Sequence, residues 1–420
     1  MDPFPRYRDV IDDYSAFREV LQRPLPVTLW ANPLRIAGEA LAERLRAKEF
    51  TPEPVSWYEG AYRFPADQRL GKQWEFFAGL YQIQEEAALL PVRLLAPAPG
   101  ETVLDLCASP GNKTAQIGLA VGPAGTVVAN DIYYKRLPPL RQTCDRLGLR
   151  NVIYTNENGG NLPNESGRFD RVLVDAPCSC EGTSRKNLNA APVADVDFTR
   201  KRQGLQRDLL DKGIQLCRPG GRIVYATCTY APEENEGVVD SVLRQHGERI
   251  RLVPAAVEGV RTAPGIEGWD GASYLPEVRH CVRVWPHLND TGGFFCAVFE
   301  KREETVPLED AVRPAELPVP EDVWIPYLLE RFGLSEDAVS GGRLVMGSSE
   351  EIHLFTGRFV TGDGLRPVRA GLRFARTDGA APKLTHPASI DLAGRATRHV
   401  VDLTEEQLAI QREAMAKQCE

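Results

Sequence analysis

The middle of the chain alternates short β-branched and aromatic runs with longer stretches of helical periodicity. The runs between residues 101 and 301 are strand candidates, because Val, Ile, Tyr and Phe are enriched in strands. They are VLDL from Val103, TVVAND from Thr126, NVIYT from Asn151, DRVLVDAP from Asp170, GRIVYATC from Gly221, HCVRVWP from His280 and FFCAVFE from Phe294. Helical stretches between or after the first five begin at Lys113, Lys135, Arg200 and Glu233. This alternation predicts an α/β domain: a Rossmann-like, doubly wound parallel sheet with helices on both faces.

The last two runs are joined differently. The loop between HCVRVWP and FFCAVFE contains Thr291, Gly292 and Gly293 and carries no helical stretch. A parallel pair needs a long crossover connection, whereas an antiparallel pair does not. We therefore expect these two strands to close one edge of the sheet as an antiparallel unit.

The flanking regions have other patterns. Residues 1–95 carry short pieces of helical periodicity and predict a mostly helical domain with one or two short strands. A central domain would span 96–302, and 303–320 have the proline-rich, acidic composition of a linker. Residues 321–420 predict a small α+β module, with strand candidates GRLVM from Gly342, EIHLF from Glu351 and GRFV from Gly357. The Thr404-x-x-Gln407 pattern, which resembles a capping box, opens a C-terminal helical stretch.

Composition narrows the class of protein. Of its 420 residues, 43% are hydrophobic and 26% are charged, which is typical of a globular protein. A chain of this length is expected to form two or three domains. Its apolar stretches are too short to cross a membrane, and its N-terminus is not built like a secretory signal. Nine cysteines, an odd number scattered through a large chain, do not form a disulfide framework. We therefore expect a cytoplasmic, monomeric protein without membrane contact.

The first candidate site is DLCASPGNKT, from Asp105 to Thr114, at the end of the first predicted strand. Such a turn lets backbone approach a ligand at the start of a helix, but it is neither GxGxxG nor a phosphate loop. Asp131 ends the second strand, where a carboxylate usually binds ribose hydroxyls, and Asn158 follows the third. Each position alone fits an ordinary strand-end turn, but together they point to S-adenosylmethionine. The candidate cofactor-binding residues are Cys107, Ala108, Ser109, Pro110, Gly111, Lys113, Asp131, Asn158 and Asp175.

Two further candidates are cysteines at strand ends. Cys178 follows the fourth strand and Cys228 the fifth, and adjacent parallel strands would bring both thiols to one pocket. The CxC of Cys178 and Cys180 has no nearby His or second cysteine pair, and the six histidines form no ligand-spaced cluster, so we expect no metal. The remaining strand cysteines fit a buried structural role.

Three ordered blocks resemble the RNA cytosine-5 methyltransferases of the Nol/Nop/Sun family, in particular the bacterial ribosomal RNA members, over roughly residues 75–300. They are LDLCASPGNKTAQ, VDAPCSCEGTSRK and YATCTYAPEENEGVV, and IQEEAALLP and DTGGFFCAVFE resemble flanking blocks. The resemblance implies that Cys228 is the nucleophile, Cys178 assists product release, Asp175 holds the base, and Lys113 pairs with Asp175 or orients its loop. In DNA cytosine-5 enzymes the cysteine of the Pro-Cys block attacks instead. The chain departs from the family pattern at three positions: Asn112 and Cys180, where glycine is common, and Asn158, where aspartate is common.

The resemblance implies an enzyme that transfers a methyl group from S-adenosylmethionine to carbon 5 of a cytidine in RNA, ribosomal RNA first and transfer RNA second. It also suggests an RNA-binding N-terminal domain and a PUA-like C-terminal module. The net charge of -8 leaves room for local basic surface, and we count +5 over 182–222 and +4 over 357–376. Two rivals remain: a catalytically silent RNA-binding assembly factor, and a methyltransferase acting on an exocyclic amine.

Overall fold

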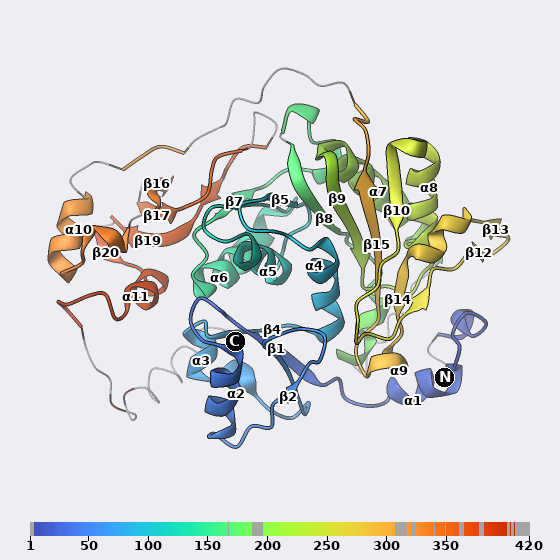
Figure 1. Cartoon of the computed structure of the whole chain (residues 1–420), viewed down its shortest axis with the longest axis horizontal. Coiled ribbons are helices and arrows are strands. Elements are labelled where there is room, and N and C mark those ends of the chain that lie inside the picture. The colour runs from blue at the N-terminus through green and yellow to red at the C-terminus, as the bar shows by residue number, and fades with distance from the viewer. Residues whose placement is uncertain are drawn as a thin grey trace.

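The computed structural model describes most of the chain in one arrangement of three parts (Figure 1). The described residues are 4–166, 168–186, 196–306, 317–320, 324–339, 341–348, 350–360, 365–377, 382–400, 404 and 407. Among these ranges no helix has the length and apolar character that crossing a membrane requires. The described cysteines are all free thiols.

A mixed sheet forms the centre of the molecule. Its strands are β5 (Thr102–Asp105), β6 (Thr126–Asn130), β7 (Val152–Thr155), β8 (Phe169–Asp175), β9 (Cys217–Thr227), β10 (Ile250–Val253), β11 (Ala263–Pro264), β14 (Val282–Val284), β15 (Phe294–Lys301) and β18 (Arg369–Ala370). They follow the order β11-β14-β15-β9-β8-β5-β6-β7-β18, and β10 pairs with β15. The five neighbouring strands β9, β8, β5, β6 and β7 are all parallel to one another. The winding reverses at β5, between β6 and β8, and ligands bind at the carboxyl ends of strands at such a point.

Helices cover both faces of this sheet (Figure 1). One core contains side chains of α4 (Leu90–Leu95), α5 (Asn112–Val121) and α6 (Leu137–Leu147). A second core, on the opposite face, contains side chains of α7 (Val196–Leu216) and α8 (Glu236–His246). Strands β5, β6 and β7 are buried at every residue because both faces are covered, which explains their near-continuous hydrophobic sequence.

The predicted central strands and their arrangement are confirmed. Each of the seven predicted runs overlaps one of the strands β5 to β9, β14 and β15. The last two pair antiparallel, with Arg283 opposite Phe295, and β15 is itself antiparallel to β9. The connection between them holds only the short helix α9 (Pro286–Asn289). A separate hairpin, β12 (Gly268–Trp269) and β13 (Ala272–Ser273), precedes this unit.

The N-terminal region corrects one expectation, because it contains a four-stranded antiparallel sheet and not one or two short strands. One of the pieces with helical periodicity, the aromatic stretch WEFFAGLYQIQEEAALL from Trp74, is not one helix. It breaks at Gly79, whose φ is +71° and where a Cβ would lie 2.0 Å from the carbonyl oxygen of Arg146. The strands are also too short to show alternation. The elements are η1 (Pro5–Tyr7), α1 (Tyr14–Val20), β1 (Val27–Ala31), α2 (Gly38–Arg46), β2 (Glu53–Pro54), β3 (Ala61–Phe64), η2 (Leu70–Lys72), α3 (Trp74–Phe77), β4 (Tyr81–Ile83) and η3 (Glu86–Leu89).

The C-terminal module is an α+β unit beside β7 (Figure 1). Its antiparallel sheet has the order β16-β17-β19-β20. The predicted strand at GRFV is wrong, because the backbone N–H of Arg358 donates to the Thr126 hydroxyl (2.9 Å) and not to a neighbouring strand. The elements are α10 (Trp324–Phe332), η10 (Glu336–Ala338), β16 (Arg343–Ser348), β17 (Glu351–Phe355), β19 (Leu372–Arg376), β20 (Lys383–Leu384) and α11 (His386–Leu392).

The predicted capping box is confirmed at Thr404 and Gln407, which exchange backbone-to-side-chain hydrogen bonds of 2.9 and 3.3 Å. The predicted C-terminal helix beyond it lies outside the described residues, as does most of the predicted linker. The PUA-like character of the module and the three boundaries between the four predicted segments stay predictions.

Candidate active site

The loop after β5 forms one wall of a cavity of about 250 Å³ at the carboxyl ends of the parallel strands. The backbone N–H of Gly111 closes this loop on the carbonyl of Ala108 at 2.8 Å. Gly111 has φ +103° and packs against Leu140, so a side chain there would be both strained and crowded. The cavity is lined by Gln84, Glu85, Ala88, Asp105, Cys107, Ala108, Ser109, Pro110, Asn112, Lys113, Asp175, Gly182, Thr183, Lys186, Cys228, Gly293 and Phe294.

Most of the predicted cofactor residues lie on this cavity, but Asp131, Asn158 and Gly111 do not line it. Asp131 is buried after β6, where its Oδ1 accepts from the backbone N–H of Tyr133 at 3.0 Å. Its Oδ2 has no hydrogen-bond partner, although Nη1 of Arg136 lies 3.5 Å away. Asn158 is exposed, and its side chain accepts from the backbone N–H of Gly160 at 3.2 Å. The structure therefore gives Asn158 a turn-forming contact.

Lys113 and Asp175 form an ion pair on the cavity wall. Lys113 lies in the first turn of α5 and Asp175 ends β8, and Nζ lies 2.7 Å from Oδ2. Burial disfavours the charged form of the lysine, but the adjacent carboxylate outweighs it, so the pKa of Lys113 is raised above its ordinary value. The predicted pairing of these two residues is present in the structure.

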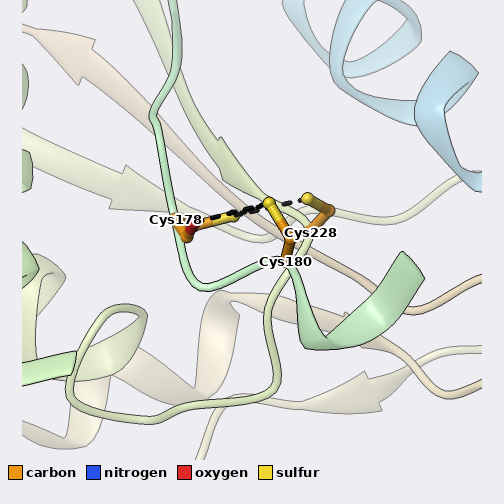
Figure 2. Close-up of side chains that lie close together, drawn as sticks. All are labelled: Cys178, Cys180 and Cys228. Carbon is orange, nitrogen blue, oxygen red and sulfur yellow. Dashed lines mark hydrogen bonds between the residues drawn. The ribbon is translucent and has the colours of Figure 1, made fainter. Parts of the chain in front are cut away.

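The sulfurs of Cys178, Cys180 and Cys228 lie close together (Figure 2). Sγ of Cys178 lies 3.3 Å from Sγ of Cys228 and 3.9 Å from Sγ of Cys180. Cys178 is buried, Cys228 is partly buried and lines the cavity, and Cys180 is exposed. The convergence of Cys178 and Cys228 follows from the parallel pairing of β8 and β9, while the approach of Cys180 depends on the conformation of its loop.

The three thiols contact one another, and their pKa values are shifted in different directions. The hydrogen bond with Cys178 lowers the pKa of Cys228, but the contact with Cys180 and burial outweigh it and raise that pKa. Contacts with Cys180 and Cys228, together with burial, raise the pKa of Cys178. Hydrogen bonds from both partners lower the pKa of Cys180. The direction of the pKa shift is therefore downward for the exposed Cys180 and upward for Cys178 and Cys228.

Glu181 joins the two loops that carry the cysteines, and sequence reasoning missed it. Its buried carboxylate accepts from the hydroxyl of Thr229 at 3.1 Å and from the backbone N–H of Tyr230 at 3.2 Å. The backbone N–H of Gly182 also donates to the carbonyl of Cys228 at 2.8 Å. The only sequence signal was its position directly after the CSC triplet.

Asp105 begins the first candidate segment, but the sequence assigned it no role of its own. It is fully buried and lines the cavity, and its Oδ2 accepts from the Thr114 hydroxyl at 2.7 Å. Its Oδ1 is buried without a hydrogen-bond partner. Burial raises the pKa of Asp105 to about 7.

Two arginines counted as basic surface are internal. Arg185 donates to the carbonyl of Thr291 at 2.8 Å and pairs with Asp290 at 2.7 Å. Arg369 is buried and pairs with Asp145 at 2.5 Å. Both guanidinium groups hold loops or modules together, so the charge counts over 182–222 and 357–376 overstate the exposed basic surface.

The chain matches known proteins over nearly its whole length. A family model for the 16S rRNA methyltransferase RsmB/F matches residues 92–300, and one for the N-terminal domain of 16S rRNA methyltransferase RsmF matches residues 6–86. The ribosomal RNA small subunit methyltransferase F of Shewanella sp. (strain MR-7) is 29% identical over 94% of this chain and 83% of its own length.

Other relatives carry names for different RNAs. The tRNA (cytosine(49)-C(5))-methyltransferase of Pyrococcus abyssi is 33% identical, over 69% of this chain and 93% of its own length. The 28S rRNA (cytosine(4447)-C(5))-methyltransferase of Homo sapiens is 31% identical over 83% of this chain. The chain spans only 42% of the length of that human protein.

A solved structure supports the same assignment. The methyltransferase homolog protein from Pyrococcus horikoshii superposes with a TM-score of 0.62 at 30% identity, over 71% of this chain and 93% of its own. The chain therefore belongs to the RsmB/F family of RNA cytosine-C5 methyltransferases, the Nol/Nop/Sun group that its sequence motifs resemble.

Proposed function

We propose that the protein methylates carbon 5 of a cytidine in ribosomal RNA through a transient bond between Cys228 and carbon 6 of the base. The observation that carries this proposal is the position of Cys228. Its thiol lies on the cavity formed by the loop after β5, together with the Lys113–Asp175 ion pair. Its Sγ is 3.3 Å from that of Cys178.

The reaction needs a nucleophile because carbon 5 of cytosine is itself a poor one. Addition of the Cys228 thiolate to carbon 6 pushes the ring electrons toward carbon 5, which then takes the methyl group. Loss of the carbon 5 proton returns that electron pair to the ring and breaks the carbon–sulfur bond. Asp175 would bind the ring nitrogen and exocyclic amine and stabilise the adduct.

Cys178 would act in the release of product. Cys178 is buried and does not line the cavity, whereas Cys228 does. Cys178 could therefore act on the bound base only from the far side of Cys228. This geometry favours Cys228 as the attacking thiol and leaves Cys178 to assist the departure of Cys228. The assignment agrees with the roles that the family resemblance implies and reverses those of the DNA enzymes.

The methyl donor of this family is S-adenosylmethionine, and the residues present fit a cationic sulfonium ligand. Asp105 lies on the cavity wall, and its buried Oδ1 has no hydrogen-bond partner. This oxygen could interact with the positive charge of the sulfonium ligand. We propose that Cys107, Ala108, Ser109, Pro110 and Gly111 hold the donor by backbone and shape. Lys113 and Asp175, which line the cavity, are further proposed contacts, and Asp131 and Asn158, which do not line it, stay predictions. When bound, the donor supplies an electrophilic methyl group.

A groove leads from the cavity to the N-terminal region. It encloses about 640 Å³, and Gln84, Glu85, Asn112 and Lys186 line both it and the cavity. We propose that the RNA strand follows this groove, since carbon 6 is accessible only in a single-stranded or flipped-out base. The N-terminal region would then bind RNA directly.

Ribosomal RNA is favoured over transfer RNA by the extent of similarity. Both family models carry ribosomal names, and one covers the N-terminal region. The Shewanella ribosomal enzyme aligns with 94% of this chain, against 69% for the archaeal tRNA enzyme. The similarity to ribosomal RNA enzymes thus extends to the segments that flank the central domain, whereas the similarity to the tRNA enzyme covers less of the chain.

Transfer of labelled methyl groups tests the proposal. Purified protein is incubated with methyl-labelled S-adenosylmethionine and either small-subunit ribosomal RNA, assembled small subunits or bulk transfer RNA, and 5-methylcytidine is mapped by bisulfite sequencing. We expect one cytidine of ribosomal RNA to be modified. Modification of transfer RNA alone would change the substrate class, absence of transfer to any RNA would favour the assembly-factor rival, and full activity of Cys228→Ala would favour the exocyclic-amine rival.

A further inference from the structure

We propose that Cys178, Cys180 and Cys228 form a binding site for a thiophilic divalent metal ion such as Zn²⁺, and that this ion competes with RNA for the active site. Among the described residues these are the one group of three or more potential metal ligands whose ligand atoms converge. The sequence argued against a metal because the CxC pair lacked a third ligand nearby in the chain. The fold supplies that ligand from the end of β9.

The spacing of the sulfurs suits tetrahedral coordination. Zn–S bonds of about 2.3 Å place the sulfurs of a tetrahedral site about 3.8 Å apart. Two of the distances in the cluster are 3.3 and 3.9 Å, and all three sulfurs lie within 4.8 Å of one another. Small rotations of the side chains would therefore complete a three-thiolate site. Its fourth position would be open to water, as in zinc sites that exchange ligands.

Access to the cluster is the second condition for metal binding. Cys180 is exposed and Cys228 borders the cavity, so an ion can reach the cluster from solvent. Binding forms three metal–sulfur bonds and releases the remaining thiol protons to solvent, and no electron transfer is involved.

The site has a consequence for catalysis, which rests on the proposed function of Cys228. A metal ion on Cys228 engages the sulfur electrons that would attack carbon 6, and a sulfur already bonded to carbon 6 is a poor metal ligand. Metal binding and formation of the covalent RNA adduct therefore oppose each other. Cys180, which takes no part in the proposed reaction, would make the difference between a weak pair of ligands and a specific site.

Metal binding can be measured without reference to activity. The full-length protein, kept reduced with a phosphine, is titrated with Zn²⁺ by calorimetry and with Co²⁺ by absorption. We expect one ion per chain and an intense near-ultraviolet thiolate-to-cobalt band. Cys180→Gly should weaken binding by at least about tenfold, because it removes one of three thiolate ligands. Cys107→Ala, a cavity cysteine outside the cluster, is the matched control and should bind as wild type does.

Methyl transfer then separates the two proposals. Zn²⁺ should inhibit the wild type, a chelator should restore it, and Cys180→Gly should retain methyl transfer while resisting Zn²⁺. Glycine suits that position because Cys180 has φ +60°. The site is refuted if Cys180→Gly binds Zn²⁺ as tightly as wild type, if the wild type binds none, or if only a disulfide reductant reverses the inhibition. Metal binding without any methyl transfer would sustain the site and refute the proposed function alone.

Discussion

The hydroxyl of Tyr7 donates a 2.7 Å hydrogen bond to the carboxylate of Glu181, which follows directly after the cysteine cluster. The same carboxylate accepts from Thr229 and Tyr230, just beyond Cys228. The first turn of the described chain is therefore tied to both cysteine-bearing loops. Tyr7 is fully buried among the aromatic side chains of Tyr230, Trp269 and Trp285, which fixes the direction of its hydroxyl.

We predict that Tyr7→Phe loosens the active site without removing any reacting group. Loss of a hydrogen bond to a buried carboxylate should lower the free energy of unfolding by about 1–3 kcal/mol. The turnover number should fall severalfold while the Michaelis constant for RNA changes little, because the effect is on the position of Cys228. Urea unfolding and steady-state methyl transfer measure the two effects. Tyr134→Phe, at an exposed tyrosine, is the control, and equal effects in both variants would contradict a positioning role.

We predict that Cys178→Ala accumulates a covalent protein–RNA adduct. If Cys228 attacks and Cys178 assists its release, the variant should form the carbon–sulfur bond and lose it slowly. The adduct would appear as a slowly migrating band on denaturing gels after incubation with RNA and the methyl donor. Cys228→Ala should form none, and Cys180→Gly should release product normally. An adduct in Cys228→Ala that is absent from Cys178→Ala would exchange the two roles.

We predict that Lys113 and Asp175 act as one unit. Asp175→Asn should reduce methyl transfer by about 10²–10³-fold, the usual cost of removing a group that stabilises a developing charge. Lys113→Met should also reduce it, because it leaves the Asp175 carboxylate without its 2.7 Å partner. A double-mutant cycle on transfer rates is the measurement, and the two losses should be far from additive. Additive losses would show that the ion pair does not matter for catalysis.

The central sheet was predictable because burial on both faces gives its strands near-continuous hydrophobic sequences. The site was predictable because functional residues of parallel sheets lie at the carboxyl ends of the strands. Cys178, Cys228 and Asp175 were found in this way. The contact of Tyr7 with Glu181 was not, since 174 residues separate them and neither belongs to a periodic pattern. Arg369 was counted as surface charge, although it pairs with the buried Asp145, because composition does not show which charges have partners. The strands of the N-terminal sheet escaped for a different reason, their short length.

We predict that the free energy of unfolding depends on pH through the carboxyl group of Asp105. Its carboxyl is fully buried, and burial raises its pKa from 3.8 to about 7. Between these two values the folded protein retains a proton that the unfolded chain has released, so raising the pH through this window favours unfolding. Above about pH 7 both states are ionised, and this contribution becomes constant. The free energy of unfolding should therefore fall, by on the order of 3 kcal/mol from this residue, between about pH 4 and pH 7.

The variant Asp105→Asn isolates that contribution. Its amide cannot ionise, and its oxygen can still accept from the Thr114 hydroxyl as Oδ2 does in the wild type. Urea unfolding at several pH values should show a shallower decline in the variant than in the wild type. Asp208→Asn, at an exposed ion pair on α7, should keep the wild-type slope. Parallel curves for wild type and Asp105→Asn would mean that Asp105 is already ionised at acidic pH, so its buried, unpartnered oxygen would be charged before any cationic ligand binds.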